Sequence, residues 1–217
     1  MPVAPNPMLR CHDLTRAPWF EGVTFEVAPG RVGFVRGPTG SGKTLLLRAI
    51  ADLDAVDSGG VELAGRSRDD VEPNVWRRRV LYLHQSAPRL PGTVLDNVLR
   101  IAALGSQSAR GDAARRAPDE CEATVRVLGL DPNADAERLS GGEAQLLAFA
   151  RAFVTRPDVF LLDEATSAMD GTTAARLETR LEREWERGAS ALWVTHDDGL
   201  EQRLGDVVVR LGETREP

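Results

Sequence analysis

The sequence has little cysteine and no long hydrophobic run. Its two cysteines, Cys11 and Cys121, lie far apart and match no metal-ligand spacing, so we expect them to be ordinary intracellular thiols. The longest apolar runs, such as 159–162, have the length of a β-strand, whereas a membrane helix needs about 20 apolar residues. We therefore expect neither a cysteine-bound metal nor a segment that spans a bilayer.

Positive charge is also scarce, because 33 acidic residues outnumber 27 basic ones and give a formal net charge of -6. This balance argues against broad electrostatic binding to nucleic acid, so no nucleic-acid partner is expected. The segment 1–8 has no basic stretch followed by an apolar one and is not expected to be a signal peptide. Hydrophobic residues at 42% and charged residues at 28% are ordinary proportions for a domain with a packed core.

The order of the apolar segments predicts an α/β fold in a single domain of residues 1–217. Three strand-length runs at 9–14, 23–27 and 32–36, separated by turn residues, predict a small antiparallel beginning. Later strand-length runs alternate with segments of helical spacing, which predicts a mostly parallel sheet covered on both sides. The expected core occupies about 8–85 and 153–211, and an inserted helical subdomain occupies about 86–152.

The individual elements follow from the period of the apolar residues. Helical spacing predicts helices at 43–51, 93–104, 120–128, 142–155 and 172–186. Apolar runs predict further strands at 61–63, 80–83, 159–162, 191–195 and 206–210. The polar stretch 105–118 is predicted to be a loop that carries no chemistry.

A glycine-rich segment follows the run 32–36 and precedes a predicted helix. It matches the pattern G-x-x-x-x-G-K-[ST], in which glycines let backbone N–H groups close around phosphate oxygens at a helix N-terminus. The single lysine of the chain, Lys43, would reach the β- and γ-phosphates, and Thr44 would bind Mg²⁺. The segment predicts a P-loop NTPase core that binds a nucleoside triphosphate. Its predicted binding residues are Gly37, Pro38, Thr39, Gly40, Ser41, Gly42, Lys43 and Thr44.

Two carboxylates follow the apolar run 159–162. Asp163 and Glu164 would lie at the carboxyl edge of the sheet, where α/β folds bind their ligands. Because strand side chains alternate, Asp163 would hold Mg²⁺, directly or through water, and Glu164 would take a proton from the attacking water. A strand that ends in Asp-Glu is equally explained by capping of the next helix, so the nucleotide role depends on the phosphate loop.

A third segment, Leu139-Ser140-Gly141-Gly142-Glu143, resembles the signature of ATP-binding cassette (ABC) ATPases, and the resemblance extends over about residues 9–211. Ser140, Gly141 and Gly142 present a hydroxyl and backbone N–H groups at a predicted helix start, which is a second phosphate-binding surface. The resemblance implies that His196 contacts the γ-phosphate and that Asp170 couples two sites across an interface. It also implies that Gln85 reaches Mg²⁺ and reports to a membrane partner.

The resemblance further implies an assembly. In the family, two cassettes sandwich two ATP molecules head to tail, and because this chain has one phosphate loop and one signature, a homodimer is implied. ATP and Mg²⁺ are the implied cofactors, and ATP hydrolysis would drive a separate integral membrane permease. An antiparallel β subdomain is implied beside the core. The implied location is cytoplasmic, on the inner face of the cell membrane.

The sequence departs from the family pattern in two places. The segment 15–20, which should carry an aromatic residue that stacks on adenine, is shortened, and the expected position falls near Arg16. Either Trp19 would stack on adenine, or Arg16 would stack by its guanidinium, or Trp19 and Phe20 would belong to the core. Leu146 occupies a position where the family commonly has a basic residue, which puts a helix-surface contact in doubt.

Three short sequence segments favour one subfamily. Tyr82-Leu83-His84-Gln85, Leu90-Pro91-Gly92-Thr93-Val94 and 192–197 look most like the small FetA-type ATPases, whose permease is proposed to act in iron export. Two other classes stay open: a soluble cassette in DNA repair, translation or iron–sulfur assembly, and a cassette that does not hydrolyse ATP. The first usually carries coiled coils, zinc modules or a second cassette, and the second would be expected to lack Glu164 or His196.

Overall fold

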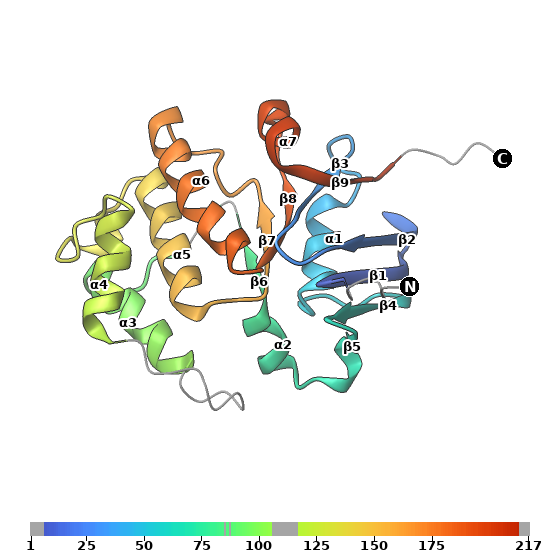
Figure 1. The fold of residues 1–217 in the computed structure, drawn as a ribbon, viewed down its shortest axis with the longest axis horizontal. Helices are drawn as coiled ribbons and strands as arrows, with labels where there is room; N and C mark the ends of the chain where they lie inside the picture. Colours follow the sequence, from blue (N-terminus) through green and yellow to red (C-terminus); the bar gives the residue numbers. More distant parts are fainter. Residues whose placement is uncertain (1–6, 85, 87, 106–116, 213–217) are drawn as a thin grey trace. The chain divides into compact units, whose positions relative to one another are not determined.

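The computed structural model describes residues 7–84, 86, 88–105 and 117–212, and the chain forms two compact units (Figure 1). The first unit comprises Met1–Tyr82, Asp158–Glu164 and Arg183–Pro217. The second unit comprises Leu83–Pro157 and Ala165–Glu182. The chain therefore passes from the first unit to the second and back twice.

A four-stranded antiparallel sheet forms one part of the first unit. Its strands, in spatial order, are β2 (Phe20–Val27), β1 (Leu9–Arg16), β4 (Ser58–Leu63) and β5 (Arg66–Ser67). β1 is antiparallel to both β2 and β4. Leu9 and Cys11, two residues apart on β1, are completely buried, so alternate side chains of this strand enter the core. Burial also raises the pKa of the Cys11 thiol, which stays protonated.

A five-stranded sheet positions the candidate site. Its strands, in spatial order, are β6 (Val80–Leu83), β7 (Val159–Asp163), β8 (Ser190–Val194), β3 (Val32–Arg36) and β9 (Gly205–Arg210). β3 is parallel to β8 and β9, and β7 is parallel to β8. Every residue of β7 and β8 is buried, as expected for parallel strands covered on both faces. The predicted mostly parallel sheet is confirmed.

The strand at 32–36 was expected in the antiparallel beginning, and that expectation is wrong. β3 lies between β8 and β9 in the parallel sheet. Val32, Phe34 and Val35 are all buried, so this strand is covered on both faces, unlike a strand of a sheet with one solvated face. Added at Gly33, a Cβ atom would come within 3.1 Å of the Leu192 side chain on β8, so glycine allows the close packing there.

The apolar pattern also misses two short helices of the first unit. α2 (Pro73–Arg79) begins with a proline, which suits the first helical position, and buries only Trp76. α7 (Asp198–Leu204) buries only Leu200. Because each seven-residue helix has one buried residue, its sequence shows no repeated spacing of apolar residues from which a helix could be predicted.

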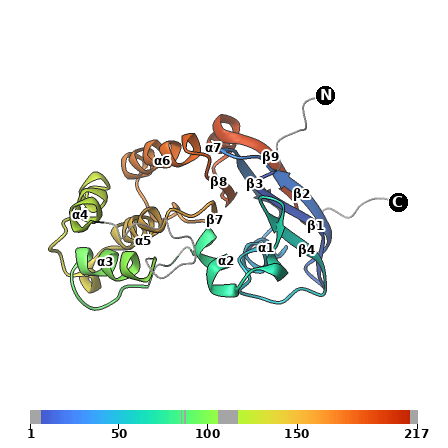
Figure 2. The same cartoon turned by 60° about the horizontal axis from the view of Figure 1, so that its bottom comes forward.

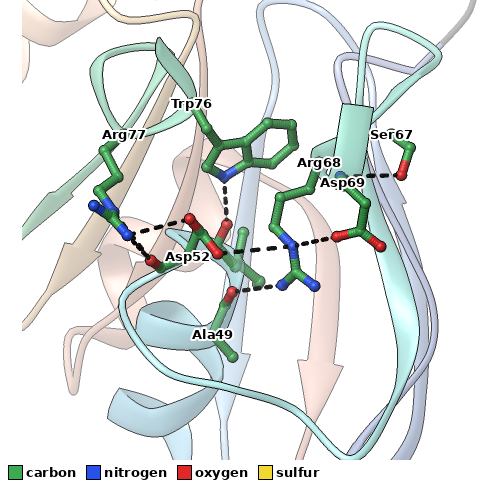
Figure 3. A network of polar contacts seen from close by, with 8 residues as sticks. Ala49, Asp52, Ser67, Arg68, Asp69, Trp76 and Arg77 are labelled. Atoms are coloured by element: carbon green, nitrogen blue, oxygen red, sulfur yellow. Dashed lines mark hydrogen bonds and ion pairs between the residues drawn. The ribbon is translucent and has the colours of Figure 1, made fainter. Parts of the chain in front are cut away.

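Helix α1 (Lys43–Ile50) packs against β7 and β8, and side chains from the segment after β5 cover its C-terminal end (Figure 3). The indole nitrogen of Trp76 donates to the carbonyl of Ile50 at 2.9 Å. The Arg77 guanidinium donates to the carbonyl of Asp52 at 2.8 and 3.0 Å. A helix C-terminus leaves its last carbonyls without helical partners, so these donors complete the end of α1.

In the second unit, α3 (Val94–Gly105), α4 (Pro118–Val127) and α5 (Gly141–Thr155) pack against one another (Figure 2). Most of α6 (Gly171–Glu186) also belongs to this unit. Their bounds agree with the predicted helices within two residues. The predicted loop at 105–118 falls mainly on 106–116, outside the described residues. Short 3₁₀ helices occur at Arg68–Asp70 in the first unit and at Ala136–Arg138 in the second.

Within the described ranges, every helix is too short or too polar to cross a bilayer.

Candidate active site

The phosphate loop joins β3 to α1 in the first unit and lines a cavity of about 280 Å³. Its glycines take backbone conformations that other residues rarely adopt, with φ of 84° at Gly40 and 89° at Gly42. Gly42 is the N-cap of α1, so the unpaired N–H groups of a helix start lie at the end of the loop. The cavity is lined by Trp19, Thr39, Gly40, Gly42, Lys43, Thr44, Leu45, Glu164, Val194 and His196.

The side chain of Lys43 is folded back onto its own loop. Its Nζ donates to the carbonyls of Gly37 at 2.8 Å and Pro38 at 2.9 Å. The hydroxyl of Ser41 is buried and has no hydrogen-bond partner in the described part of the chain. A buried polar group without a partner calls for an explanation, and a missing ligand is one. Both observations suit a loop that closes around phosphate oxygens, which would accept from these donors.

Glu164 and His196 lie together at the carboxyl ends of β7 and β8. His196 Nε2 is 3.3 Å from Glu164 Oε1, and both residues line the cavity. Glu164 has φ of 49°, uncommon for a residue other than glycine, and its N–H donates to the carbonyl of Val194 at 2.9 Å. Of the three residues predicted as catalytic, the structure thus brings Glu164 and His196 to the phosphate loop, and the third, Gln85, lies outside the described residues.

Asp163, the last residue of β7, has a structural partner that the sequence did not reveal. The carboxylate is 5% exposed, and the hydroxyl of Tyr82 donates to its Oδ2 at 2.8 Å. Burial and the neighbouring Asp163 carboxylate raise the pKa of Tyr82, which keeps the phenol protonated as a donor. Tyr82 is the one tyrosine of the sequence, and this rarity is the only signal that could have drawn attention to it.

Thr44 and Asp163 offer the donor set that a magnesium ion prefers. Thr44 lies in the first turn of α1, and α1 packs against the strand that ends at Asp163. A hydroxyl, a carboxylate and phosphate oxygens are hard ligands of the kind that Mg²⁺ binds in nucleotide sites. The residues present therefore fit this ion.

Of the two candidates for stacking on adenine, Trp19 lines the cavity and Arg16 lies beside it. Trp19 is 42% exposed and lines the cavity, whereas Phe20 is 5% exposed and belongs to the core. The Arg16 guanidinium lies 5.4 Å from the centre of the Trp19 ring and donates to Asp54 Oδ2 at 2.8 Å. Arg48 donates to the same carboxylate at 2.8 and 3.0 Å. The hydrogen bonds from Arg48 and Arg16 lower the pKa of Asp54 to about 2.

The signature segment begins helix α5 in the second unit with a reciprocal capping box. The N–H of Glu143 donates to Ser140 Oγ at 3.3 Å, and Glu143 Oε2 accepts from the N–H and the hydroxyl of Ser140 at 2.9 and 2.7 Å. These bonds lower the pKa of Glu143. Ser140 and Gly141 are exposed. A Cβ at Gly142 would come within 3.2 Å of the Ala168 carbonyl, so glycine permits a close approach there.

Three other residues singled out in the sequence have different outcomes. Asp170 is placed at the start of α6, where its carboxylate accepts from the N–H groups of Thr172 and Thr173, both at 3.0 Å. Leu146 is 5% exposed, so this position makes apolar contacts in this chain instead of presenting a basic group to solvent. Gln85 lies outside the described residues.

Known proteins resemble this chain over most of its length. A family model described as ABC transporter matches residues 20–167. The aliphatic sulfonates import ATP-binding protein of Cupriavidus necator is 37% identical over 89% of this chain. The sn-glycerol-3-phosphate import ATP-binding protein of Rhodopseudomonas palustris is 34% identical over 87% of this chain. The chain spans 61% and 51% of the lengths of these two relatives.

Solved structures share the fold. A structure described as the ATP binding subunit of an ABC transporter has a TM-score of 0.80 and 25% identity, covering 94% of this chain and 85% of that one. A dimeric ATP-binding cassette in a post-hydrolysis state with ADP and Pi has a TM-score of 0.79 and 24% identity, covering 94% of both chains. The predicted combination of a P-loop core, an antiparallel sheet and a helical insertion is confirmed.

Proposed function

Because the chain belongs to the ABC transporter family of P-loop ATPases, we propose that two copies close over two ATP molecules and thereby drive a separate membrane permease. The chain is an ATP-hydrolysing, ATP-binding subunit of this family. The observation that carries the proposal is the division of phosphate-binding groups between the two units. The phosphate loop, Glu164 and His196 share one cavity in the first unit, whereas the exposed start of α5 at Ser140 belongs to the second.

In the proposed reaction, the loop N–H groups and Lys43 hold the β- and γ-phosphates. Glu164 accepts a proton from the attacking water, and His196 contacts the γ-phosphate and orients that water. Their separation of 3.3 Å between Nε2 and Oε1 allows both to face one small ligand. Thr44, Asp163 and Gln85 would hold Mg²⁺, which neutralises charge on the phosphates when bound.

The adenine base is proposed to stack on Trp19. The indole lines the same cavity as the phosphate loop, and Arg16, the other candidate, is held by Asp54. A guanidinium fixed in an ion pair is less free to turn toward a base. The Cβ atom of Trp19 lies close enough to the loop that a Cβ at Gly42 would come within 2.8 Å of it, so base and phosphate sites are neighbours.

The second half of the proposed site comes from the partner copy. Ser140, Gly141 and Gly142 would bind the γ-phosphate of the nucleotide held by the other chain, and Asp170 would couple the two sites. A two-fold symmetric dimer makes both sites alike. The exposure of Ser140 and Gly141 supports this arrangement, because a phosphate can reach them. The proposed location is the cytoplasmic face of the cell membrane, beside the permease.

We further propose that the chain is a FetA-type cassette that acts in metal export. The support is the three short strings at 82–85, 90–94 and 192–197. The two relatives described above are named as import proteins, and their sulfonate and glycerol phosphate substrates are their own. Deletion of the gene separates the directions: an exporter predicts a higher intracellular iron content in iron-rich medium, and an importer predicts a lower one or no change.

The test of the proposed dimer is light scattering on Glu164→Gln with and without Mg-ATP. Loss of the base should leave phosphate binding intact and trap the closed dimer, so the molecular mass should double when Mg-ATP is added. Lys43→Ala, which removes the phosphate-binding ammonium, is the control and should stay monomeric. A Glu164→Gln variant that hydrolyses ATP at the parental rate would refute the assignment of the base. A variant that binds ATP without dimerising would refute closure by the isolated chain.

A further inference from the structure

We infer that Arg36 is a positioning residue for ATP hydrolysis, because its guanidinium joins the base of the phosphate loop to the backbone that carries His196. This inference rests on the proposed role of His196 at the γ-phosphate. Arg36 is the last residue of β3 and directly precedes Gly37, the first residue of the loop. It belongs to none of the motifs by which the site is recognised from the sequence.

The guanidinium of Arg36 binds three acceptors that lie far away in the sequence. Nη1 donates to the carbonyl of Thr195 at 2.8 Å, and Nε donates to the Glu201 carboxylate at 2.5 Å. Nη2 donates to Asp198 at 2.9 Å. The side chains of Arg36 and Glu201 are 19% and 24% exposed, whereas that of Asp198 is 84% exposed. The first two contacts are therefore partly shielded from water and matter most.

The contact from Nη1 holds the peptide group directly before His196, and the other two hold the guanidinium on residues of α7. Residues 195–197, which connect β8 to α7, are also held by a bond among themselves, since the N–H of Asp197 donates to Thr195 Oγ1 at 3.1 Å. The Asp197 carboxylate in turn caps α7 by accepting from the N–H of Leu200 at 3.0 Å. Thr195 is 9% exposed, but the side chain of His196 is 73% exposed. An exposed imidazole has little packing around it, so its position depends on the backbone to which it is attached.

The position of this imidazole decides its chemistry. His196 Nε2 lies 3.3 Å from Glu164 Oε1, and a shift of residues 195–197 would change this distance and the reach toward the γ-phosphate. A misplacement of about 1 Å in an active site can cost up to about a hundredfold in rate. Lys43 and the loop N–H groups do not depend on this segment, so ATP binding should survive the loss of Arg36. The expected effect is on kcat and not on KM.

The test compares Arg36→Met with a matched control, Arg79→Met. Arg79 pairs with Asp158 at 2.6 Å, and the side chains are 18% and 22% exposed, close to the values for Arg36 and Glu201. Arg79 and Asp158 precede β6 and β7, at the amino edge of the sheet and away from the phosphate loop. Methionine keeps an apolar stem of similar length in both variants. Both should lose similar thermal stability.

Only Arg36→Met is expected to lower kcat, by about tenfold, while its KM for ATP changes by less than about twofold. Arg36→Lys should recover part of the loss, because one ammonium cannot serve three acceptors in the fork geometry of a guanidinium. A second readout is the NMR spectrum of the imidazole side chains. The chain has three histidines, so the His196 signals can be assigned with His196→Gln. They should shift in Arg36→Met and stay unchanged in Arg79→Met.

Parental kcat in Arg36→Met, or an equal loss of kcat in Arg79→Met, would overturn the inference. If Arg36→Met does not fold, Glu201→Gln replaces it, since this change weakens one contact and keeps the bond to Thr195. It should lower kcat by a smaller factor with KM unchanged, and parental kcat would again overturn the inference. Failure of the proposed function has a different signature: His196→Gln itself would then hydrolyse ATP at the parental rate.

Discussion

The carboxylate of Asp54 allows a stability prediction with a worked magnitude. It accepts bonds from Arg16 at 2.8 Å and from Arg48 at 2.8 and 3.0 Å, and its side chain is 15% exposed. Its pKa falls from the ordinary 3.8 to about 2. Since one pKa unit corresponds to about 1.4 kcal/mol, the ionised carboxylate contributes about 2 kcal/mol to the free energy of unfolding. Asp54→Asn should lose this amount at pH 7.

The pH dependence of this loss is fixed by the direction of the shift. The folded-state pKa lies below the unfolded-state value, so the stabilisation is fully present above the ordinary pKa of about 4 and is lost as the pH falls toward 2. The difference between the parent and Asp54→Asn should therefore shrink from about 2 kcal/mol at pH 7 to about 1 kcal/mol at pH 3.

Urea unfolding followed by tryptophan fluorescence measures this difference in the relevant part of the molecule. The four tryptophans, Trp19, Trp76, Trp185 and Trp193, all belong to the first unit, as does Asp54. Glu26→Gln is the control, because the Arg10–Glu26 pair at 2.7 Å has side chains that are 41% and 53% exposed. Such an exposed pair should change the free energy of unfolding by less than about 1 kcal/mol. An Asp54→Asn loss that is equal at pH 7 and pH 3 would refute the electrostatic reasoning.

Three further predictions concern single side chains. Trp76→Phe should lower the free energy of unfolding, measured with urea, by about 1–2 kcal/mol more than Trp193→Phe does, because Trp76, unlike Trp193, donates a hydrogen bond to the end of α1. The indole nitrogen of Trp193 is buried without a partner among the described residues, so equal losses would contradict this account. Lys43→Ala should weaken ATP binding by at least about tenfold in a fluorescent-nucleotide titration, and unchanged affinity would remove Lys43 from the phosphate site. Ser140→Ala should speed amide exchange in the first turn of α5 by the loss of about 1 kcal/mol of capping energy. In the parent this protection should decrease as the pH falls below the ordinary range of Glu143, whose pKa is lowered by Ser140; protection that is independent of pH would count against the capping box.

Helices whose apolar residues recur at helical spacing, and strands with a continuous apolar run, were predictable from the sequence. α3 buries one face over 12 residues and α5 is buried over most of its 15 residues, and their bounds were found within two residues. The seven-residue helices α2 and α7 have one buried residue each, too few to define a face. The assignment of β3 failed for another reason: a turn before a strand does not say whether the next strand returns to the same sheet.

The residues of the candidate site also fall into two groups, those that a local sequence pattern predicts and those that depend on partners far away in the sequence. The phosphate loop, Asp163–Glu164 and Ser140–Gly142 are local segments with a recognisable residue spacing, so the sequence alone is enough to predict them as site residues. Tyr82, Asp54 and Arg36 act through partners 81, 38 and 159 positions away, and no local pattern encodes such pairs. Their contribution is visible only once the strands that carry Tyr82 and Arg36, and the loop that carries Asp54, are assembled.

Gly42 lies in the phosphate loop and against the side chain of Trp19. Its φ of 89° and the 2.8 Å that would separate a Cβ from Trp19 mean that any side chain there would disturb the loop and the indole together. A substitution at position 42 would therefore act on both proposed contacts of ATP, the phosphate loop and the indole of Trp19. Because the close contact is with the Cβ atom of Trp19, which every residue except glycine also has, exchanging Trp19 for another aromatic residue would leave the constraint on position 42 in place.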